Sequence, residues 1–237
     1  MTAGDQIIDI DTALKAWRES LFEVLPVAGL IARSQVAHKW KAPFRSFMLR
    51  EAVCWRLQDL LTQSWFLHQH GHGLGARILL RSSLETLSIL IYLNQLMQKV
   101  LEGRLEFHEF SNKTTALLTG TRIDDAGVKA VNILTVLEKC DRRYPGIKSM
   151  YDDLSESAHP NWEGLCNGYS TINRDEYETV FSNRWMELHG DKHPDLIVLC
   201  IRTFYDEYND VWDQLFTQLE EWIEANDVEL EKTKPKH

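Results

Sequence analysis

Apolar positions recur at helical spacing near the N-terminus. Leu14, Trp17 and Leu21 follow one another at intervals of three and four residues, which places them on one face of a helix. Asp11 stands at the start of this run as a candidate N-cap, and Pro26 is expected to kink or split the helix. One amphipathic helix is therefore expected to open the chain.

Two longer helical patterns follow, and the second of them is unusual. The first spans residues 44–70 and stops at the glycine-rich sequence GHGLG. The second runs from about Leu74 to Glu102 and is apolar around most of its circumference. At about 100° per residue its polar side chains fall in one narrow stripe, made up of Arg77, Arg81, Glu85, Ser88, Tyr92, Gln95 and Lys99. Such a helix packs against neighbours on most sides, so we expect it at the centre of the fold.

The rest of the chain is helical apart from one irregular segment. Further helices are predicted at residues 124–141, 147–158 and 194–225. Residues 160–193 break the pattern, and within them YSTIN and YETVF are predicted to pair as a small hairpin across RDE. The polar tail, about residues 228–237, is expected to fray.

These elements predict an all-α bundle of five to seven helices, with one irregular loop or small hairpin insertion. The 237 residues are 44% hydrophobic and show no repeat and no low-complexity linker, so a single helical domain over 1–237 is the simplest organisation. The net charge of −9 argues against a protein that binds nucleic acid over its whole surface. Any contact with phosphate would have to come from a local basic cluster.

Composition also favours a cytoplasmic protein. The N-terminal sequence MTAGDQIIDID lacks a secretory signal pattern, and the most apolar run, LETLSILIYLNQLM, is too short and too polar to span a bilayer. The four cysteines lie far apart without a C-x-x-C pair, as is typical of a reducing compartment; they are Cys54, Cys140, Cys166 and Cys200. No cofactor and no membrane partner are expected.

The polar stripe is the first candidate site. If it faces an internal cleft, the guanidinium groups of Arg77 and Arg81 could bind a carboxylate or a phosphate, oriented by Glu85. The alternative is an exposed strip of a mostly buried helix, which is polar because water touches it. Both interpretations remain open at this point.

The sequence YDDLSESAHPNW forms the second candidate. Tyr151, Ser155 and His159 share one side of the short helix, and His159 lies in its last turn, immediately before a proline. One interpretation is a histidine that caps the helix C-terminus. The other is a general acid/base or an anion contact, with Asn161 beside it.

Two weaker patterns involve histidines. His68, His70 and His72 alternate along HQHGH, which would permit a shared metal ion only if the backbone there were extended or looped. The spacing R-x-x-x-x-H, which marks RNA-cleaving HEPN domains, occurs at Arg33–His38 and at Arg184–His189. Because a chain with many Arg and His residues produces such matches by chance, neither is assigned a role.

Two segments carry a resemblance to known proteins. RSSLETLSILIYL and YDDLSESAHPNWEGL resemble a family of prokaryotic helical proteins that has Arg-x-x-x-Glu on a hydrophobic helix and a later Leu-Ser-x-x-x-His-Pro. The resemblance implies that Arg81, Glu85, Ser155 and His159 are the positions of interest. The helical pattern as a whole is similar to that of HEPN domains.

We therefore expect the two candidate segments to pack together and to form one polar pocket for an anionic ligand. His159 and Glu85 would be the catalytic groups, and the ligand contacts would come from Arg77, Arg81, Ser155, Tyr151 and Asn161. HEPN-like processing of RNA or of a nucleotide, in stress or phage defence, is the function this implies. The alternative is a non-enzymatic scaffold or regulatory protein whose polar cluster is structural. A homodimer is an alternative to a monomer.

Overall fold

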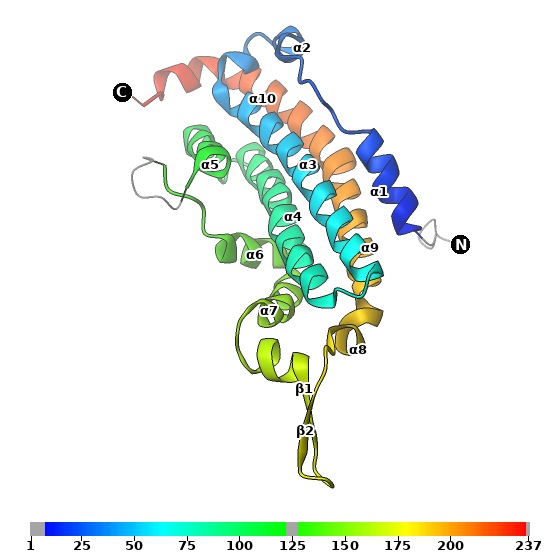
Figure 1. Ribbon diagram of the computed structural model, residues 1–237. Coiled ribbons are helices and arrows are strands. Elements are labelled where there is room, and N and C mark those ends of the chain that lie inside the picture. Colours follow the sequence, from blue (N-terminus) through cyan, green and yellow to red (C-terminus); the bar gives the residue numbers. More distant parts are fainter. Residues whose placement is uncertain (1–7, 122–127, 236–237) are drawn as a thin grey trace, which may run out of the picture. The chain divides into compact units, whose positions relative to one another are not determined.

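The computed structural model describes residues 8–121 and 128–235, and these are mostly helical (Figure 1). The helices are α1 (Ile10–Glu19), α2 (Val27–Arg33), α3 (Lys41–Gln69), α4 (Gly73–Leu101), α5 (Phe107–Thr119), α6 (Ile133–Asp141), α7 (Ile147–Ala158), α8 (Trp185–His189), α9 (His193–Tyr205) and α10 (Trp212–Lys232). The strands β1 (Ser170–Asn173) and β2 (Glu178–Phe181) form one antiparallel pair.

The all-α class and the small hairpin are confirmed, but the predicted number of helices is too low. Nine helices lie in the described ranges when α9, the π-helical stretch η5 (Asp206–Val211) and α10 are counted as one continuous helix. One reason is α5, for which the sequence analysis predicted no helix although Phe107, Phe110 and Thr114 lie buried along it at helical spacing. Within the same ranges, no helix combines the length and the apolar character that a membrane span requires.

Several predicted boundaries also need correction. Helix α1 is capped by Asp9, whose carboxylate accepts a hydrogen bond from the Thr12 amide, and not by Asp11. The helix predicted over residues 124–141 is described only as α6, since residues 122–127 lie outside the described ranges. Of the tail predicted to fray, residues 228–232 are part of α10, which ends at Lys232.

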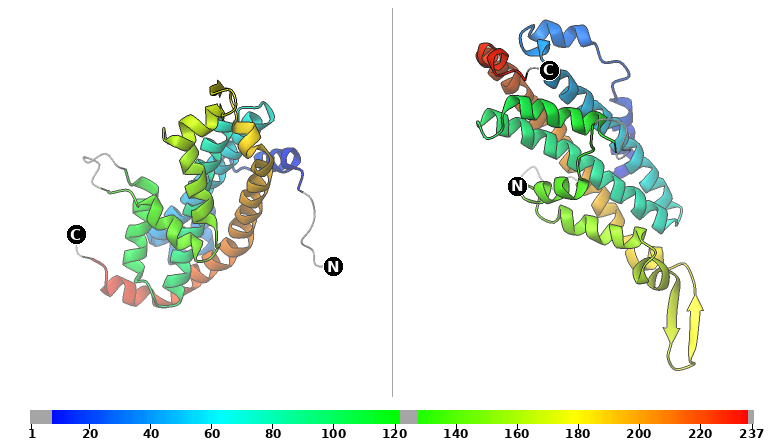
Figure 2. Two further views of the ribbon diagram at one scale, coloured as in Figure 1. Left: turned by 90° about the horizontal axis from the view of Figure 1, so that it is seen from below. Right: turned by 90° about the vertical axis from the view of Figure 1, so that its left-hand side faces the viewer.

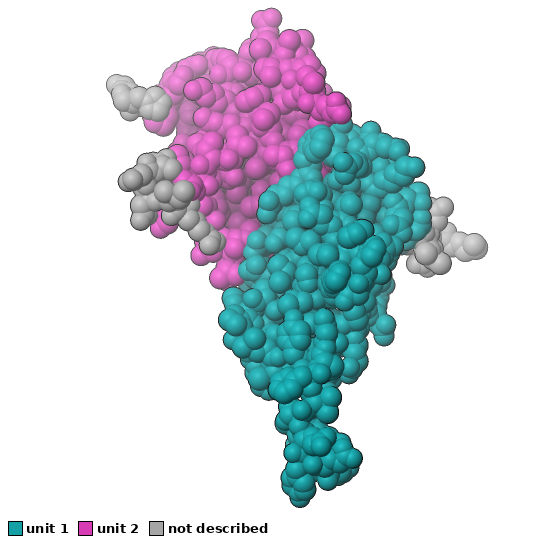
Figure 3. Space-filling model, viewed as in Figure 1, with its two compact units in different colours: residues 1–21, 55–86, 144–202 teal, residues 22–54, 87–143, 203–237 magenta. Residues whose placement is uncertain are grey.

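The chain divides into two compact units, each assembled from three stretches of sequence (Figure 3). Unit one contains residues 1–21, 55–86 and 144–202, and unit two contains residues 22–54, 87–143 and 203–237. Helices α3, α4 and α9 contribute residues to both units. The single domain over 1–237 remains a prediction, and each unit is described below by itself.

Unit one is built on an antiparallel pair made by the second half of α3 and the first half of α4 (Figure 1). The two segments are joined by a tight turn at Gly71, whose φ of 77° is a left-handed conformation that glycine adopts without strain. Helix α1 packs against α3, since the Trp65 indole on α3 donates to the Asp11 carboxylate on α1, and Trp17 of α1 is 1% exposed. The side-chain amide of Gln58 donates a hydrogen bond to the Leu14 carbonyl.

A pair of histidines lies in the core of unit one. His193 is 2% exposed, its ring stacks on that of His68 at 4.8 Å, and its Nε2 lies 3.0 Å from the Ser64 hydroxyl. That hydroxyl also lies 2.8 Å from the Ala76 carbonyl oxygen, to which it donates. Burial lowers the pKa of His193 to about 4, with smaller contributions from His68 and Arg77. The core of unit one therefore contains an uncharged imidazole near neutral pH.

The irregular segment of unit one lies between α7 and α9. The π-helical turn η3 (Trp162–Asn167) leads into β1, and α8 follows β2. The fully buried indole of Trp185 holds this region together, and it packs so closely on Gly168 that a Cβ there would lie 2.5 Å from the ring. The hairpin extends away from these turns (Figure 2).

Unit two has an aromatic core around α10 and the first half of α3. Trp212 and Phe216 stack at 5.1 Å, and the guanidinium of Arg50 lies 3.5 Å from the centre of the Tyr208 ring. The Tyr208 hydroxyl donates to the carboxylate of Glu51 at 2.9 Å. The cation–π contact of Arg50 with the ring and the hydrogen bond of the hydroxyl to Glu51 together fix the position of Tyr208.

We predict that acid destabilises the protein partly through His193. Between its ordinary pKa of 6.5 and its folded pKa of about 4, the unfolded chain binds a proton that the folded protein rejects, so stability falls as the pH is lowered through this window. In His193→Gln, the loss of unfolding free energy between pH 7 and pH 4 should be smaller by an amount on the order of 3 kcal/mol. Urea unfolding at several pH values measures it.

The matched control is His72→Gln, because His72 is exposed. It should reproduce the wild-type dependence on pH. An unchanged slope in His193→Gln would contradict the assignment.

Candidate functional site

The polar stripe of α4 is largely covered by two other helices, although the side chains of Arg81 and Glu85 remain 25% and 27% exposed. Over the first half of α4, in unit one, the partners come from α7, and over the second half, in unit two, they come from α6. Neither interpretation of the stripe given above is therefore sufficient. Its two halves form different kinds of contact, which are described in turn.

Arg81 is the centre of the network in unit one. Its Nε donates to the Ser155 hydroxyl at 2.8 Å, and its Nη2 donates to the Tyr151 hydroxyl at 2.6 Å. The same Nη2 lies 3.2 Å from Glu85 Oε1, and the Tyr151 hydroxyl donates to that oxygen at 3.1 Å. The predicted meeting of Arg81, Glu85, Tyr151 and Ser155 is present, and the four groups bind one another.

Arg77 forms a second network one helical turn earlier on α4. It is 3% exposed, its Nε donates to the Ser157 hydroxyl at 2.7 Å, and its Nη2 donates to both the carboxylate and the carbonyl of Asp153. The donors of Arg77 are thus directed at α7. Both arginines use their donors on protein groups, which leaves little for a bound anion.

His159 lies outside both networks. It follows the last residue of α7 with φ −93° and ψ 143°, the extended geometry expected before a proline, and the residue is exposed. Its ring makes no hydrogen bond within residues 8–121 and 128–235. Asn161 binds locally instead, accepting from the Gly164 amide and donating to Glu156. The structure therefore does not bring His159 or Asn161 to Arg81, and the catalytic roles of His159 and Glu85 remain predictions.

The histidine patterns of the sequence form local contacts. His68 packs between Trp65 and His193, and His70 lies on the ring of Phe66. In the described part of the chain, no group of three or more His, Cys, Asp or Glu residues is placed to hold a metal ion.

The two R-x-x-x-x-H pairs also bind nearby protein groups. Arg33 and His38 both bind the carboxylate of Glu220, at 2.8 and 2.7 Å. Arg184 binds Glu187 at 3.0 Å. Each pair is therefore engaged in holding the protein's own segments together.

The second half of the stripe, in unit two, leads to a different environment. The ammonium of Lys139 on α6 lies 3.2 Å from the Tyr92 hydroxyl and 4.7 Å from the centre of its ring. The side-chain amide of Gln95 donates to the Lys139 carbonyl at 3.1 Å. Here α4 meets α6 through neutral acceptors, and positive charge accumulates without a carboxylate on α4 to offset it.

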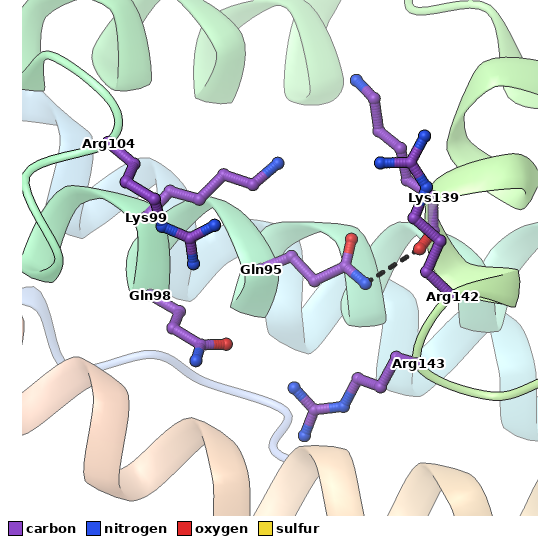
Figure 4. Close-up of a pocket in the computed structure, with 7 residues that line it drawn as sticks. All are labelled: Gln95, Gln98, Lys99, Arg104, Lys139, Arg142 and Arg143. Carbon is purple, nitrogen blue, oxygen red and sulfur yellow. Dashed lines mark hydrogen bonds between the residues drawn. The ribbon is translucent and has the colours of Figure 1, made fainter.

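This end of the stripe opens into a basic cleft of about 380 Å³ (Figure 4). We call it the basic cleft and define it by the residues that line it, which are Gln95, Gln98, Lys99, Arg104, Lys139, Arg142 and Arg143. They come from the C-terminal ends of α4 and α6 and from the turns that follow. Five of the seven are cationic and none is acidic, in a chain whose net charge is −9.

The cations of the basic cleft differ in how well they are compensated. Arg143 Nε lies 2.8 Å from the carboxylate of Glu207, which is fully buried and which also accepts from the Asn94 amide. Arg104 binds Glu102 in the same turn. The side chains of Lys99 and Arg142 make no ion pair or hydrogen bond with any described residue.

The pKa of Lys99 reflects this crowding. It is lowered from its ordinary value, chiefly because burial disfavours the charged form, and next because Lys139, Arg104 and Arg142 repel a further positive charge. A bound anion would relieve that repulsion. The cations of the cleft thus repel one another, and the positive potential they create attracts anions.

The basic cleft was not predicted from the sequence, although part of the signal is present there. Gln95 and Lys99 belong to the predicted polar stripe, but the predicted pocket lies at its opposite end. The sequence KCDRR, which brings Lys139, Arg142 and Arg143 to one helix end, was not singled out. The need for a local basic cluster was recognised from the acidic composition, and this is where the structure has one.

Comparisons with known proteins add nothing to this geometry. No protein-family model matches the chain, and neither the curated proteins nor the solved structures include a match. The resemblances given above on the two sequence motifs thus remain predictions.

We predict that Arg81 is a structural residue. In Arg81→Met, the Tyr151, Ser155 and Glu85 groups lose their shared donor, so the free energy of unfolding should fall by about 2 kcal/mol, which is the scale of hydrogen bonds to a charged group. Thermal and urea unfolding measure it. Arg18→Met is the control, since Arg18 is an exposed helical arginine, and it should change stability by less than about 0.5 kcal/mol. Equal stability of both variants would contradict the prediction.

Proposed function

We propose that the protein binds a phosphate-bearing ligand in the basic cleft. The observation that carries the proposal is the set of five cations around one hollow that has no acidic residue in its lining. Lysine and arginine side chains are the usual partners of phosphate, and arginine can bind it through two parallel hydrogen bonds. An acidic protein with a local basic cluster can bind such a ligand there without attracting nucleic acid over its whole surface.

The positions of Lys99 and Lys139 at helix ends explain part of the cluster, but not why the cations point into one hollow. Lys99 and Lys139 lie in the last turns of α4 and α6, where the helix dipole favours a positive charge. This effect explains how each cation is tolerated in the unbound protein. The helix dipole gives no reason for the two helix ends to direct their cations at the same hollow. An anionic ligand that binds in the hollow would give such a reason.

A nucleotide and a segment of RNA offer the same phosphate chemistry, and the sequence resemblance favours ligands of this kind. HEPN-like processing of either, in stress or phage defence, is the finer part of the proposal and rests on that resemblance alone. The cleft itself supports binding and not catalysis of such processing. Its lining in the described chain contains no imidazole and no carboxylate that could act as a general base.

A structural role is the better account of the Arg81 network, because its groups bind one another. The structural alternative raised by the sequence thus applies to one end of the stripe, and the ligand-binding proposal applies to the other. The two functions are separable by mutation.

We predict that pyrophosphate, a nucleoside triphosphate or a short single-stranded RNA binds with an affinity that depends on Lys99 and Arg142. Lys99→Gln and Arg142→Gln should each weaken binding about tenfold, since each removes one charged contact worth about 1.4 kcal/mol. Binding should weaken further as salt is raised. Isothermal titration calorimetry at two salt concentrations measures both effects, and the three probes distinguish a nucleotide site from an RNA site.

Lys148→Gln is the charge-matched control, because Lys148 lies on α7 and pairs with Asp152. It should bind like the wild type, and so should Arg81→Met at a temperature where it is folded. If none of the three probes binds, or if Lys148→Gln weakens binding as much as Lys99→Gln does, the proposal is wrong.

The RNA probe also tests processing. If wild-type protein cleaves the RNA, loss of cleavage in His159→Ala would support the acid/base role predicted from the sequence. Retained cleavage in that variant would rule the role out.

A further inference from the structure

The β-hairpin has one face without a charged side chain. The register pairs Ser170 with Phe181 and Ile172 with Thr179, and because side chains alternate along a strand these four share one face. We call it the apolar face of the hairpin. The opposite face carries Thr171, Asn173, Glu178 and Val180, so only one side of the ribbon has the uncharged character of an interface core.

The apolar face is exposed to an unusual degree. Ile172 and Phe181 are 72% and 79% exposed, although both are large and hydrophobic. The hairpin also has only two strands, so each strand has an open edge. A two-stranded ribbon is at best marginally stable alone in water, and a partner that covers the face would stabilise it.

The base of the hairpin is firmly held in unit one. Arg184, which follows β2, donates to the carbonyls of Asn167 and Ser170 at 3.0 and 3.1 Å. Trp185 packs on Gly168 directly before β1. The structure therefore presents the ribbon in a defined direction, away from its neighbouring turns (Figure 2).

The exposed apolar area near the hairpin is close to what a stable interface needs. Trp162, Tyr177 and Phe181 are 68%, 94% and 79% exposed, and together they present roughly 450 Å² of aromatic surface. Ile172 and Leu165 raise the total to roughly 650 Å², against about 800 Å² per partner in a standard interface. These side chains come from the hairpin and from η3, which contacts β1, and exposed apolar side chains that gather in one region of a monomer mark interaction sites.

We propose that the hairpin is a dimerisation element that docks on the hairpin of a second copy of this chain, apolar face against apolar face. A two-fold axis makes such a contact self-complementary, so one surface serves both partners. The turn between the strands carries Arg174 beside Asp175 and Glu176, a net charge of −1, and hairpins that run antiparallel across the axis keep these like-charged turns apart.

The test compares two double variants that add the same charges to the two faces. Ile172→Lys with Phe181→Lys charges the apolar face, and Thr171→Lys with Val180→Lys charges the opposite face of the same strands. All four side chains are exposed, so neither variant should unfold the protein, as circular dichroism checks. Light scattering coupled to size exclusion, on full-length protein at about 100 µM, should give twice 27.6 kDa for the wild type and for the second variant. It should give a single 27.6 kDa for the first.

Three outcomes would overturn the proposal. If the wild-type protein is a monomer, the dimerisation proposal is wrong, whatever else the hairpin binds. A first variant that stays dimeric places the interface elsewhere, and monomers from both variants show that the ribbon matters but not this face of it.

Discussion

Helix α4 imposes the constraint on which the rest of the structure depends. It is apolar around most of its circumference and buried along its length, yet it carries a stripe of polar and charged groups. A buried polar group without a partner is costly, and a buried charge more so. The helices that cover the stripe must therefore supply hydrogen-bond acceptors as well as apolar surface, and these helices are α7 and α6.

The two halves of the stripe meet this constraint in different ways. Over the first half, α7 presents two hydroxyl groups to Arg81, which Glu85 completes from α4 itself. Over the second half, α6 brings a further cation, Lys139, and offers α4 only its carbonyl oxygen and a cation–ring contact. The positive charge is thus compensated at one end and accumulates at the other, so the same helix carries both a structural network and the basic cleft.

The sequence was sufficient where the local pattern determines the outcome. The bounds of α7 were predicted as they occur, because RYPG ends the preceding segment and a proline follows, and the hairpin was predicted from two short strands around a polar turn. The meeting of Arg81 with Ser155 was also anticipated, since both lie on the polar sides of helices that need partners. Helix α5 was missed although Phe107 and Phe110 carry its apolar face, because polar residues on either side obscured the period.

What the sequence does not determine is which neighbour satisfies each charged group. Arg81 and Lys99 belong to one stripe, and nothing in their spacing distinguishes an arginine that donates to three protein groups from a lysine whose ammonium has no hydrogen-bond or ion-pair partner among the described residues. That difference arises from residues more than thirty positions away, where α7 supplies Tyr151 and Ser155 and α6 supplies Lys139. A charged group on this helix is therefore available for a ligand where the neighbouring helix brings a like charge and no acceptor. The basic cleft is where α4 meets this condition, and it is therefore the candidate site.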